Sequence, residues 1–111
     1  MNEEVRYRLL KLLSQNPELS QRDLAQKLGI SLGKVNYCVR ALKEKGLVKV
    51  NNFKNNPSKT GYLYMLTPKG IEEKAGVTAR FFKRKLKEYE KLEEEIEQLR
   101  KEVIAIENAI E

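Results

Sequence analysis

The sequence is poor in the side chains that most often carry out chemistry. Its 111 residues contain no histidine and no tryptophan, and Cys38 and Asp23 are its only cysteine and its only aspartate. This composition removes most metal ligands and the commonest general base, and one cysteine excludes both an intramolecular disulfide and a cysteine-cluster zinc site. We therefore expect no metal, no cofactor and no enzymatic activity.

Long apolar runs are also absent. No stretch approaches the roughly 18 apolar residues that a membrane-spanning helix needs. The first residues, MNEEVRYRLL, carry acidic side chains where a signal peptide would have basic ones. The sequence therefore predicts a cytoplasmic protein with no membrane partner, whose length allows one modest core of about 70 residues and an appended element.

Positive charge is concentrated in the first part of the chain. The net charge is +6, but residues 1–70 hold 13 lysines and arginines against 5 acidic residues, whereas residues 71–111 hold 9 against 11. A polyanion, and nucleic acid above all, is the natural partner of such a surface. An ordinary solvated basic face would have the same count.

The apolar pattern predicts three short helices followed by a hairpin and a long helix. Helical spacing places the first three helices at 3–15, 21–28 and 31–45, with Ser20 and Ser31 as N-caps of the second and third. The period then falls to about 2, which indicates strands at residues 47–53 and 62–67 around a cationic turn.

A threonine-proline pair at residues 67–68 marks the start of the last helix, which we expect to continue to the C-terminus with an interruption at residues 76–77. From Phe82 onward its apolar residues lie 4, 3, 3, 4, 3, 4, 3 and 4 apart, an average of 3.5 that is typical of a coiled coil. Such a helix extends about 50 Å and cannot bury its stripe against its own domain.

We therefore expect homodimerisation through this stripe, because leaving large aliphatic side chains exposed costs about 1.5–3 kcal/mol each and a second copy is the economical partner. A hairpin within one chain is the alternative, but the segment contains no turn signal. The division predicted is a domain at residues 1–76 and a coiled-coil helix at residues 77–111. The predicted dimer residues are Phe82, Leu86, Tyr89, Leu92, Ile96, Leu99, Val103, Ile106 and Ile110.

The second and third helices have the spacing of a helix-turn-helix. Ala25 is a small residue for the helix crossing, Gly29 permits a left-handed turn, and Val35 is an aliphatic anchor for the second helix. Because a hairpin follows, the fold predicted is mainly α (α+β): a winged helix-turn-helix domain followed by a long C-terminal coiled-coil helix.

The segment at residues 19–50, LSQRDLAQKLGISLGKVNYCVRALKEKGLVKV, resembles winged helix-turn-helix transcription regulators of the MarR type, and the resemblance resumes at residues 64–70, YMLTPKG. The match is closer to a subgroup of small EPS-associated regulators, in which an LLKLL…NPELSQRDLA…LGISLGKVNYC run recurs. This resemblance implies a bacterial transcription regulator that binds double-stranded DNA as a homodimer. It also implies a link to exopolysaccharide biosynthesis.

On such a fold the helix at residues 31–45 enters the major groove. Asn36 can bond adenine and Arg40 guanine, and Gly33 lets the helix approach the DNA backbone. The remaining residues are suited to phosphates, although all of them could simply form the solvated half of a core helix. The DNA-facing residues predicted on this helix are Ser31, Gly33, Lys34, Asn36, Tyr37 and Arg40.

The hairpin at residues 54–61 would serve as the wing, on phosphates or the minor groove. The larger family generally presents an arginine there, whereas this wing has lysines only, so we prefer nonspecific phosphate contact. The residues predicted to make it are Lys54, Asn55, Asn56, Lys59 and Thr60.

Three alternatives stay open. The basic run RFFKRKLK at residues 80–87 either touches flanking phosphates or is a solvated face, and Cys38 is either a redox sensor or, as we prefer, a small buried hydrophobe. MarR-type proteins often bind small ligands beside a larger dimerisation domain, and no effector can be named for this chain. The alternative function is a winged-helix scaffold whose coiled coil pairs with another protein.

Overall fold

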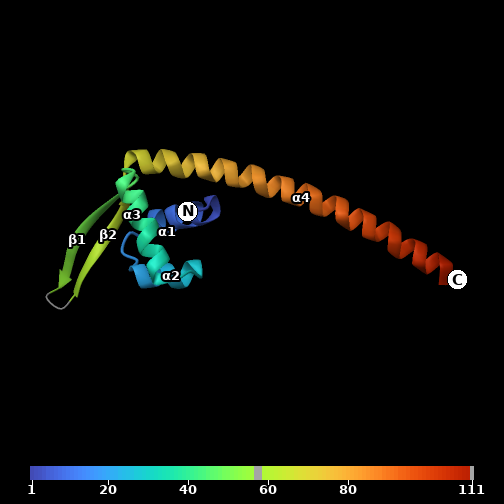
Figure 1. Cartoon of the computed structure of the whole chain (residues 1–111), viewed down its shortest axis with the longest axis horizontal. Helices are drawn as coiled ribbons and strands as arrows, with labels where there is room; N and C mark the ends of the chain where they lie inside the picture. Colours follow the sequence, from blue (N-terminus) through green and yellow to red (C-terminus); the bar gives the residue numbers. More distant parts are fainter. Residues whose placement is uncertain (57–58, 111) are drawn as a thin grey trace. The chain divides into compact units, whose positions relative to one another are not determined.

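The computed structural model describes residues 1–56 and 59–110, and the side chains of residues 53–60 lie outside that description. Three helices precede a hairpin and a long helix, as the sequence predicts (Figure 1). The elements are α1 (Glu3–Gln15), α2 (Gln21–Leu28), α3 (Leu32–Glu44), β1 (Val48–Asn56), β2 (Lys59–Leu66) and α4 (Pro68–Ile110).

Each of the three short helices begins at a side chain that caps its free backbone N–H groups. The Asn2 side chain accepts a hydrogen bond from the Val5 N–H at 2.8 Å, and Ser31 accepts one from Lys34 at 3.1 Å. In α2 the cap is reciprocal, because Ser20 and Asp23 each accept a hydrogen bond from the other's backbone N–H. The predicted helix bounds are confirmed, with Ser31 as the N-cap of α3.

The turn between α2 and α3 depends on a glycine. Gly29 ends α2 with φ 68° and ψ 33°, in the left-handed region, and its N–H donates to the Ala25 carbonyl at 2.9 Å. A residue with a Cβ is strained in this conformation. The Ala25 and Gly29 pair therefore sets the angle at which α3 leaves α2.

One apolar core holds the helices and the hairpin together. It contains Leu9 and Leu13 from α1, Leu24 from α2, and Leu42 from α3, each no more than 1% exposed. The predicted inward stripe of α3 is confirmed, because its four members are all buried: Val35, Cys38, Val39 and Leu42.

The strands β1 and β2 form an antiparallel hairpin, with Val48 opposite Leu66 and Lys54 opposite Thr60. Both strands are longer than the alternating apolar pattern predicts, since main-chain pairing toward the tip does not require apolar side chains. The Tyr64 N–H donates to the Pro17 carbonyl at 3.0 Å. This bond fastens the hairpin to the loop between α1 and α2.

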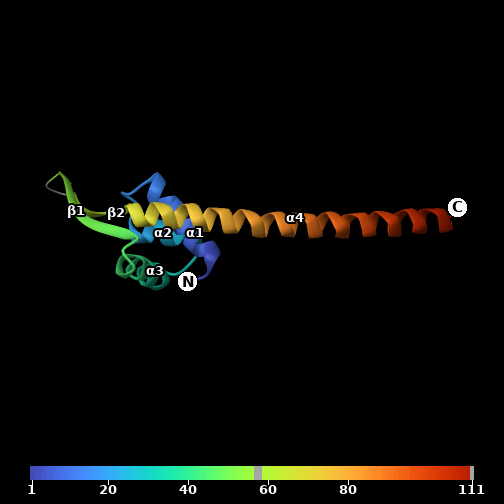
Figure 2. The same ribbon diagram turned by 90° about the horizontal axis from the view of Figure 1, so that it is seen from above.

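The start of α4 is fixed against the end of α3. The Leu47 carbonyl accepts a hydrogen bond from the Thr67 N–H at 3.0 Å, and Thr67 in turn accepts one from the Gly70 N–H at 3.0 Å. A Cβ at Gly70 would lie 2.0 Å from the Leu47 carbonyl oxygen, so only glycine fits this approach. Arg6 of α1 also binds Glu73 of α4 at 3.0 Å, where the first turns of α4 pass over α1 (Figure 2).

The expected interruption at residues 76–77 is wrong, because α4 runs without a break through Gly76 and Val77. Glycine inside a helix costs only about 1 kcal/mol relative to alanine, and burial of Val77, which is 0% exposed, favours the helix here. Among the described helices, none combines the length and apolar content that crossing a membrane requires.

The chain divides into two units, Met1–Ala79 and Arg80–Glu111, which we call the head and the tail helix. The head contains the core described above. The tail helix is a single helical segment, and the predicted dimer residues lie on it with side chains 44–80% exposed. Within one chain this apolar stripe is therefore uncovered.

Candidate nucleic-acid interface

The polar face of α3 is the strongest candidate for contact with nucleic acid. Its buried residues lie on one side, and Tyr37 on the opposite side is 65% exposed. All six residues predicted to face DNA are exposed: Ser31, Gly33, Lys34, Asn36, Tyr37 and Arg40. The structure thus brings them together on one helix, clear of the core.

The first turn of α3 is open to a close partner. A Cβ built on Gly33 would meet no atom within 4 Å, so nothing in the head covers this turn. The Ser31 hydroxyl accepts the Lys34 N–H, and its own O–H is still able to donate. A phosphate at this helix N-terminus would meet free backbone N–H groups and the positive end of the helix dipole.

Asn36 and Arg40 belong to a chain of hydrogen bonds that crosses from α3 to α2 and β2. Arg40 Nη2 donates to Asn36 Oδ1 at 3.2 Å, and Asn36 Nδ2 donates to Gln21 Oε1 at 3.2 Å. Gln21 Nε2 then donates to the Tyr64 hydroxyl at 3.4 Å. These bonds fix which end of the Asn36 amide is the acceptor and which is the donor.

The network leaves Asn36 enough capacity to read a base. An amide group has two N–H donors and two acceptor lone pairs, and the network uses one of each. Bidentate recognition of adenine needs one donor and one acceptor. Arg40 likewise keeps most of its five N–H donors for guanine.

A surface hollow of about 320 Å³ lies between α3 and the hairpin. Its wall contains residues that the sequence interpretation did not assign to the site, among them Gln21, Tyr62 and Tyr64. Tyr62 is 56% exposed, and its ring centroid lies 6.3 Å from that of Tyr64. Gln21 could have been found as the first residue after the Ser20 cap, because that position starts α2, which precedes α3 in the helix-turn-helix.

The wing is less fully described than α3. Backbone pairing confirms a hairpin, with an irregularity in register between Lys54 and Asn56. The side chains of all five predicted wing contacts lie outside the described residues, so their contact with phosphate stays a prediction: Lys54, Asn55, Asn56, Lys59 and Thr60.

Cys38 and the basic run at residues 80–87, the other candidate functional residues, lie where structural roles are expected. Cys38 is 1% exposed within the core, as expected of a small buried hydrophobe. In the basic run of the tail helix, the Arg84 guanidinium and the Lys85 ammonium lie 5.1 and 5.2 Å from the centre of the Phe81 ring. Among residues 1–56 and 59–110, no three His, Cys, Asp or Glu side chains are grouped so as to hold a metal ion.

The head has a winged helix-turn-helix fold, because a helix-turn-helix is followed directly by an antiparallel hairpin packed on the same core. A family model described as winged helix-turn-helix DNA-binding matches residues 3–49. The HTH-type transcriptional regulator LrpA of Pyrococcus horikoshii is 36% identical over 64 residues, which are 58% of this chain and 45% of that protein. The chain thus spans about half the length of this curated relative.

Solved structures show the same fold. S. aureus MepR in complex with DNA has a TM-score of 0.67 and 23% identity, over 100% of this chain and 80% of that chain. A MarR-family transcriptional regulator from Rhodococcus sp. RHA1 has a TM-score of 0.56 and 26% identity, over 68% of this chain and 52% of that chain. LrpA and the Rhodococcus protein are transcriptional regulators by description, and MepR is described in complex with DNA.

Proposed function

We propose that the protein is a homodimeric, sequence-specific DNA-binding transcriptional regulator of the MarR type, with α3 (Leu32–Glu44) in the major groove. The observation that carries this proposal is the exposed face of α3, on which Asn36 and Arg40 are oriented by hydrogen bonds and still have unused donors and acceptors. A helix presented in this way beside a hairpin is the docking element of helix-turn-helix proteins.

In this proposal base reading and phosphate binding fall to different residues. Asn36 and Arg40 read base edges, each good pair giving about 1–3 kcal/mol of discrimination. Ser31 and Lys34, with Tyr37, hold phosphates near the start of α3, where Gly33 leaves room for the backbone. The lysines of the wing add nonspecific phosphate contact, which the positive charge of residues 1–70 supports.

Dimerisation through the tail helix supplies the second head. The apolar stripe from Phe82 to Ile110 is exposed in one chain, and its 3.5-residue period matches that of a coiled coil. Two heads imply a palindromic or nearly palindromic operator, with half-sites about one helical turn apart.

The finer role rests on sequence resemblance. The run from LLKLL to LGISLGKVNYC is similar to the small EPS-associated regulators, so we propose control of exopolysaccharide biosynthesis genes by a cytoplasmic protein. No effector is assigned.

Selection of bound duplexes from a random DNA pool, at two salt concentrations, tests the proposal. The parent should yield a consensus of two related half-sites, and Asn36→Ala and Arg40→Ala should each lose one base preference while the dimer persists. Lys101→Ala, which removes one positive charge from an exposed position of the tail helix, is the matched control and should keep the consensus.

The alternative is a winged-helix scaffold whose tail helix pairs with another protein. It predicts no consensus at either salt concentration, and equal binding of all DNA by the parent, N36A and R40A. That result would remove the assignment of base reading to α3. The oriented pair of Asn36 and Arg40 on an exposed face favours the regulator.

A further inference from the structure

We propose that the two tail helices pair in parallel and in register, so that Glu95 of one copy lies beside Arg100 of the other. This inference rests on the homodimer of the proposed function and adds its orientation. It also decides whether the two heads are joined to the same end of the paired helices.

From Tyr89 onward the apolar stripe of the tail helix follows one regular heptad. Its two columns are spaced seven residues apart, and the steps between them alternate between 3 and 4. In heptad notation the a column holds Tyr89, Ile96, Val103 and Ile110, and the d column holds Leu92, Leu99 and Ile106. All seven side chains are between 46% and 80% exposed in one chain, so the whole seam is available to a partner.

The residue types in these columns favour two parallel strands. β-Branched side chains at a with leucine at d fit the holes of a parallel two-stranded coiled coil. Three of the four a residues are isoleucine or valine, and two of the three d residues are leucine. Tyr89 is the polar member, and a hydrogen bond to Glu93, together with the negative charge of that carboxylate, raises the pKa of Tyr89. This bond gives the Tyr89 hydroxyl a partner at the flank of the seam.

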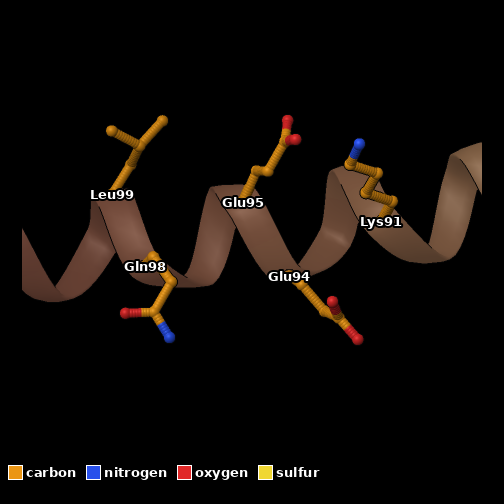
Figure 3. A pocket seen from close by; sticks show the side chains of 5 residues that line it. All are labelled: Lys91, Glu94, Glu95, Gln98 and Leu99. Carbon is orange, nitrogen blue, oxygen red and sulfur yellow. The ribbon is translucent and has the colours of Figure 1, made fainter.

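The charges that flank the seam oppose an antiparallel arrangement. On one flank, the g column, every charged residue is a glutamate: Glu88, Glu95 and Glu102. Figure 3 shows Glu95 and Leu99 one turn apart on the same side of the helix, so this flank borders the seam. Fully overlapping antiparallel helices place g beside g, which brings Glu95 close to Glu102 of the other copy.

The other flank, the e column, gives the same result. It contains Glu93, Arg100 and Glu107. In the antiparallel arrangement Arg100 faces its own copy, and Glu93 faces Glu107. No opposite charges meet along the seam in that orientation.

In a parallel pair each g residue lies beside the e residue five positions later in the partner. Glu95 then meets Arg100 on both sides of the dimer, which gives two attractive contacts. The other pairs, Glu88 with Glu93 and Glu102 with Glu107, repel each other in this arrangement. Arg100 is free to make the contact because its own-chain bond to Glu97 is long, at 3.5 Å, and exposed.

Orientation matters because each head is joined to the N-terminal end of its tail helix. Parallel helices bring these two ends together, whereas antiparallel helices separate them by most of the roughly 45 Å of the paired segment. The parallel arrangement therefore joins both heads to the same end of the dimer, whereas the antiparallel one joins them to opposite ends.

Cysteine cross-linking of the full chain tests this orientation. Leu92→Cys and Ile106→Cys, near opposite ends of the seam, should each form a disulfide-linked dimer alone under mild oxidation. Glu97→Cys, on the outer side of the helix, and the parent, whose Cys38 is buried, are the controls and should not cross-link.

If dimers form but L92C cross-links only when it is mixed with Val103→Cys, the a residue that faces position 92 in the antiparallel arrangement, the helices are antiparallel and the orientation is overturned while the homodimer stands. If sedimentation shows monomers at micromolar concentration, both the homodimer and its orientation fail. These outcomes separate the two proposals.

A charge exchange tests the contact between Glu95 and Arg100. Arg100→Glu should weaken the dimer about tenfold, since two attractive contacts become repulsive. Adding Glu95→Arg in the same chain restores opposite charges and should return the dimer dissociation constant to within about twofold of the parent. Failure of the double variant to recover would overturn the proposed pairing.

Discussion

The head and the tail helix differ in the exposure of their apolar side chains. The head, Met1–Ala79, buries leucines from α1, α2 and α3 in its own core. The tail helix carries as regular an apolar stripe and leaves it 44–80% exposed. The first arrangement is complete in one chain, whereas the second leaves its apolar side chains uncovered in one chain.

The head and the tail helix also differ in net charge. Residues 1–79 hold 14 lysines and arginines against 7 acidic residues, whereas the tail helix, residues 80–111, holds 8 against 9. A basic head suits a polyanion, whereas the tail helix carries almost no net charge. The comparison teaches that the head and the tail helix carry different kinds of surface, and that each can be changed without the other.

The largest difference in stability between the two units should appear when one leucine is changed to alanine in each. Leu42→Ala, in the head core, should lower the free energy of unfolding by about 2–5 kcal/mol, because it opens a cavity around a side chain that is 0% exposed. Leu99→Ala, at a position 58% exposed in one chain, should leave the head unchanged. Urea unfolding followed by tyrosine fluorescence measures both, and equal losses would contradict the independence of the units.

A lysine placed in the seam should separate dimerisation from folding. Ile96→Lys should weaken the dimer roughly a hundredfold, because a charged group replaces a buried aliphatic side chain. Gln98→Lys adds the same side chain on the outer side of the helix and serves as the control. Sedimentation of both variants at micromolar concentration measures the effect, and a dimeric I96K would exclude the seam as the contact.

Salt should weaken DNA binding by the head and strengthen dimerisation through the tail helix. Doubling the salt concentration should weaken DNA binding about tenfold if roughly four phosphates are contacted. The same change should slightly strengthen the dimer, because screening reduces repulsion among the glutamates that flank the seam. Binding titrations and sedimentation at matched salt concentrations measure the two effects, and a dimer that weakens with salt would contradict the excess of repulsive contacts.

The smallest effect concerns the cap of α2. Hydrogen bonds with the side chain and the backbone of Ser20 lower the pKa of the Asp23 carboxyl below its ordinary value of 3.8. Because the folded-state pKa is depressed, the stabilisation is present above about 3.8 and is lost as the pH falls through the folded value. Asp23→Asn should therefore make the head less sensitive to acid.

Thermal unfolding from pH 5 down to pH 2 measures that sensitivity, with Glu44→Gln, an exposed acid at the end of α3, as the control. The parent and E44Q should lose stability in parallel, and D23N should lose less. The tail helix lies outside this effect, so dimerisation at pH 5 should be the same for all three chains.

Much of the head could be predicted from the sequence because its signals are local. Ser20, Gly29 and Ser31 act within a few residues of their own positions, and they set the helix bounds that the structure shows. The exposed face of α3 follows from the same helical period as its buried stripe. Local rules also failed at residues 76–77, where burial of Val77 outweighs the low helix propensity of Gly76.

What the sequence could not predict depends on contacts between distant residues. Asn36 and Gln21 are 15 positions apart, and no pattern along the chain indicates that Gln21 orients the Asn36 amide. The same holds for the hydrogen bond between Gln21 and Tyr64, which are 43 positions apart. The candidate readout residues were found from helical spacing, but their common network required the packed head.

The approach of Gly70 to the Leu47 carbonyl makes position 70 informative about the evolution of this chain. A methyl group there would push the start of α4 away from Leu47. A single substitution of Gly70 would therefore disrupt this junction. Chains that share it should therefore keep glycine at this position even where their recognition residues have diverged. The requirement for glycine at position 70 thus comes from the junction itself and does not depend on the polar face of α3.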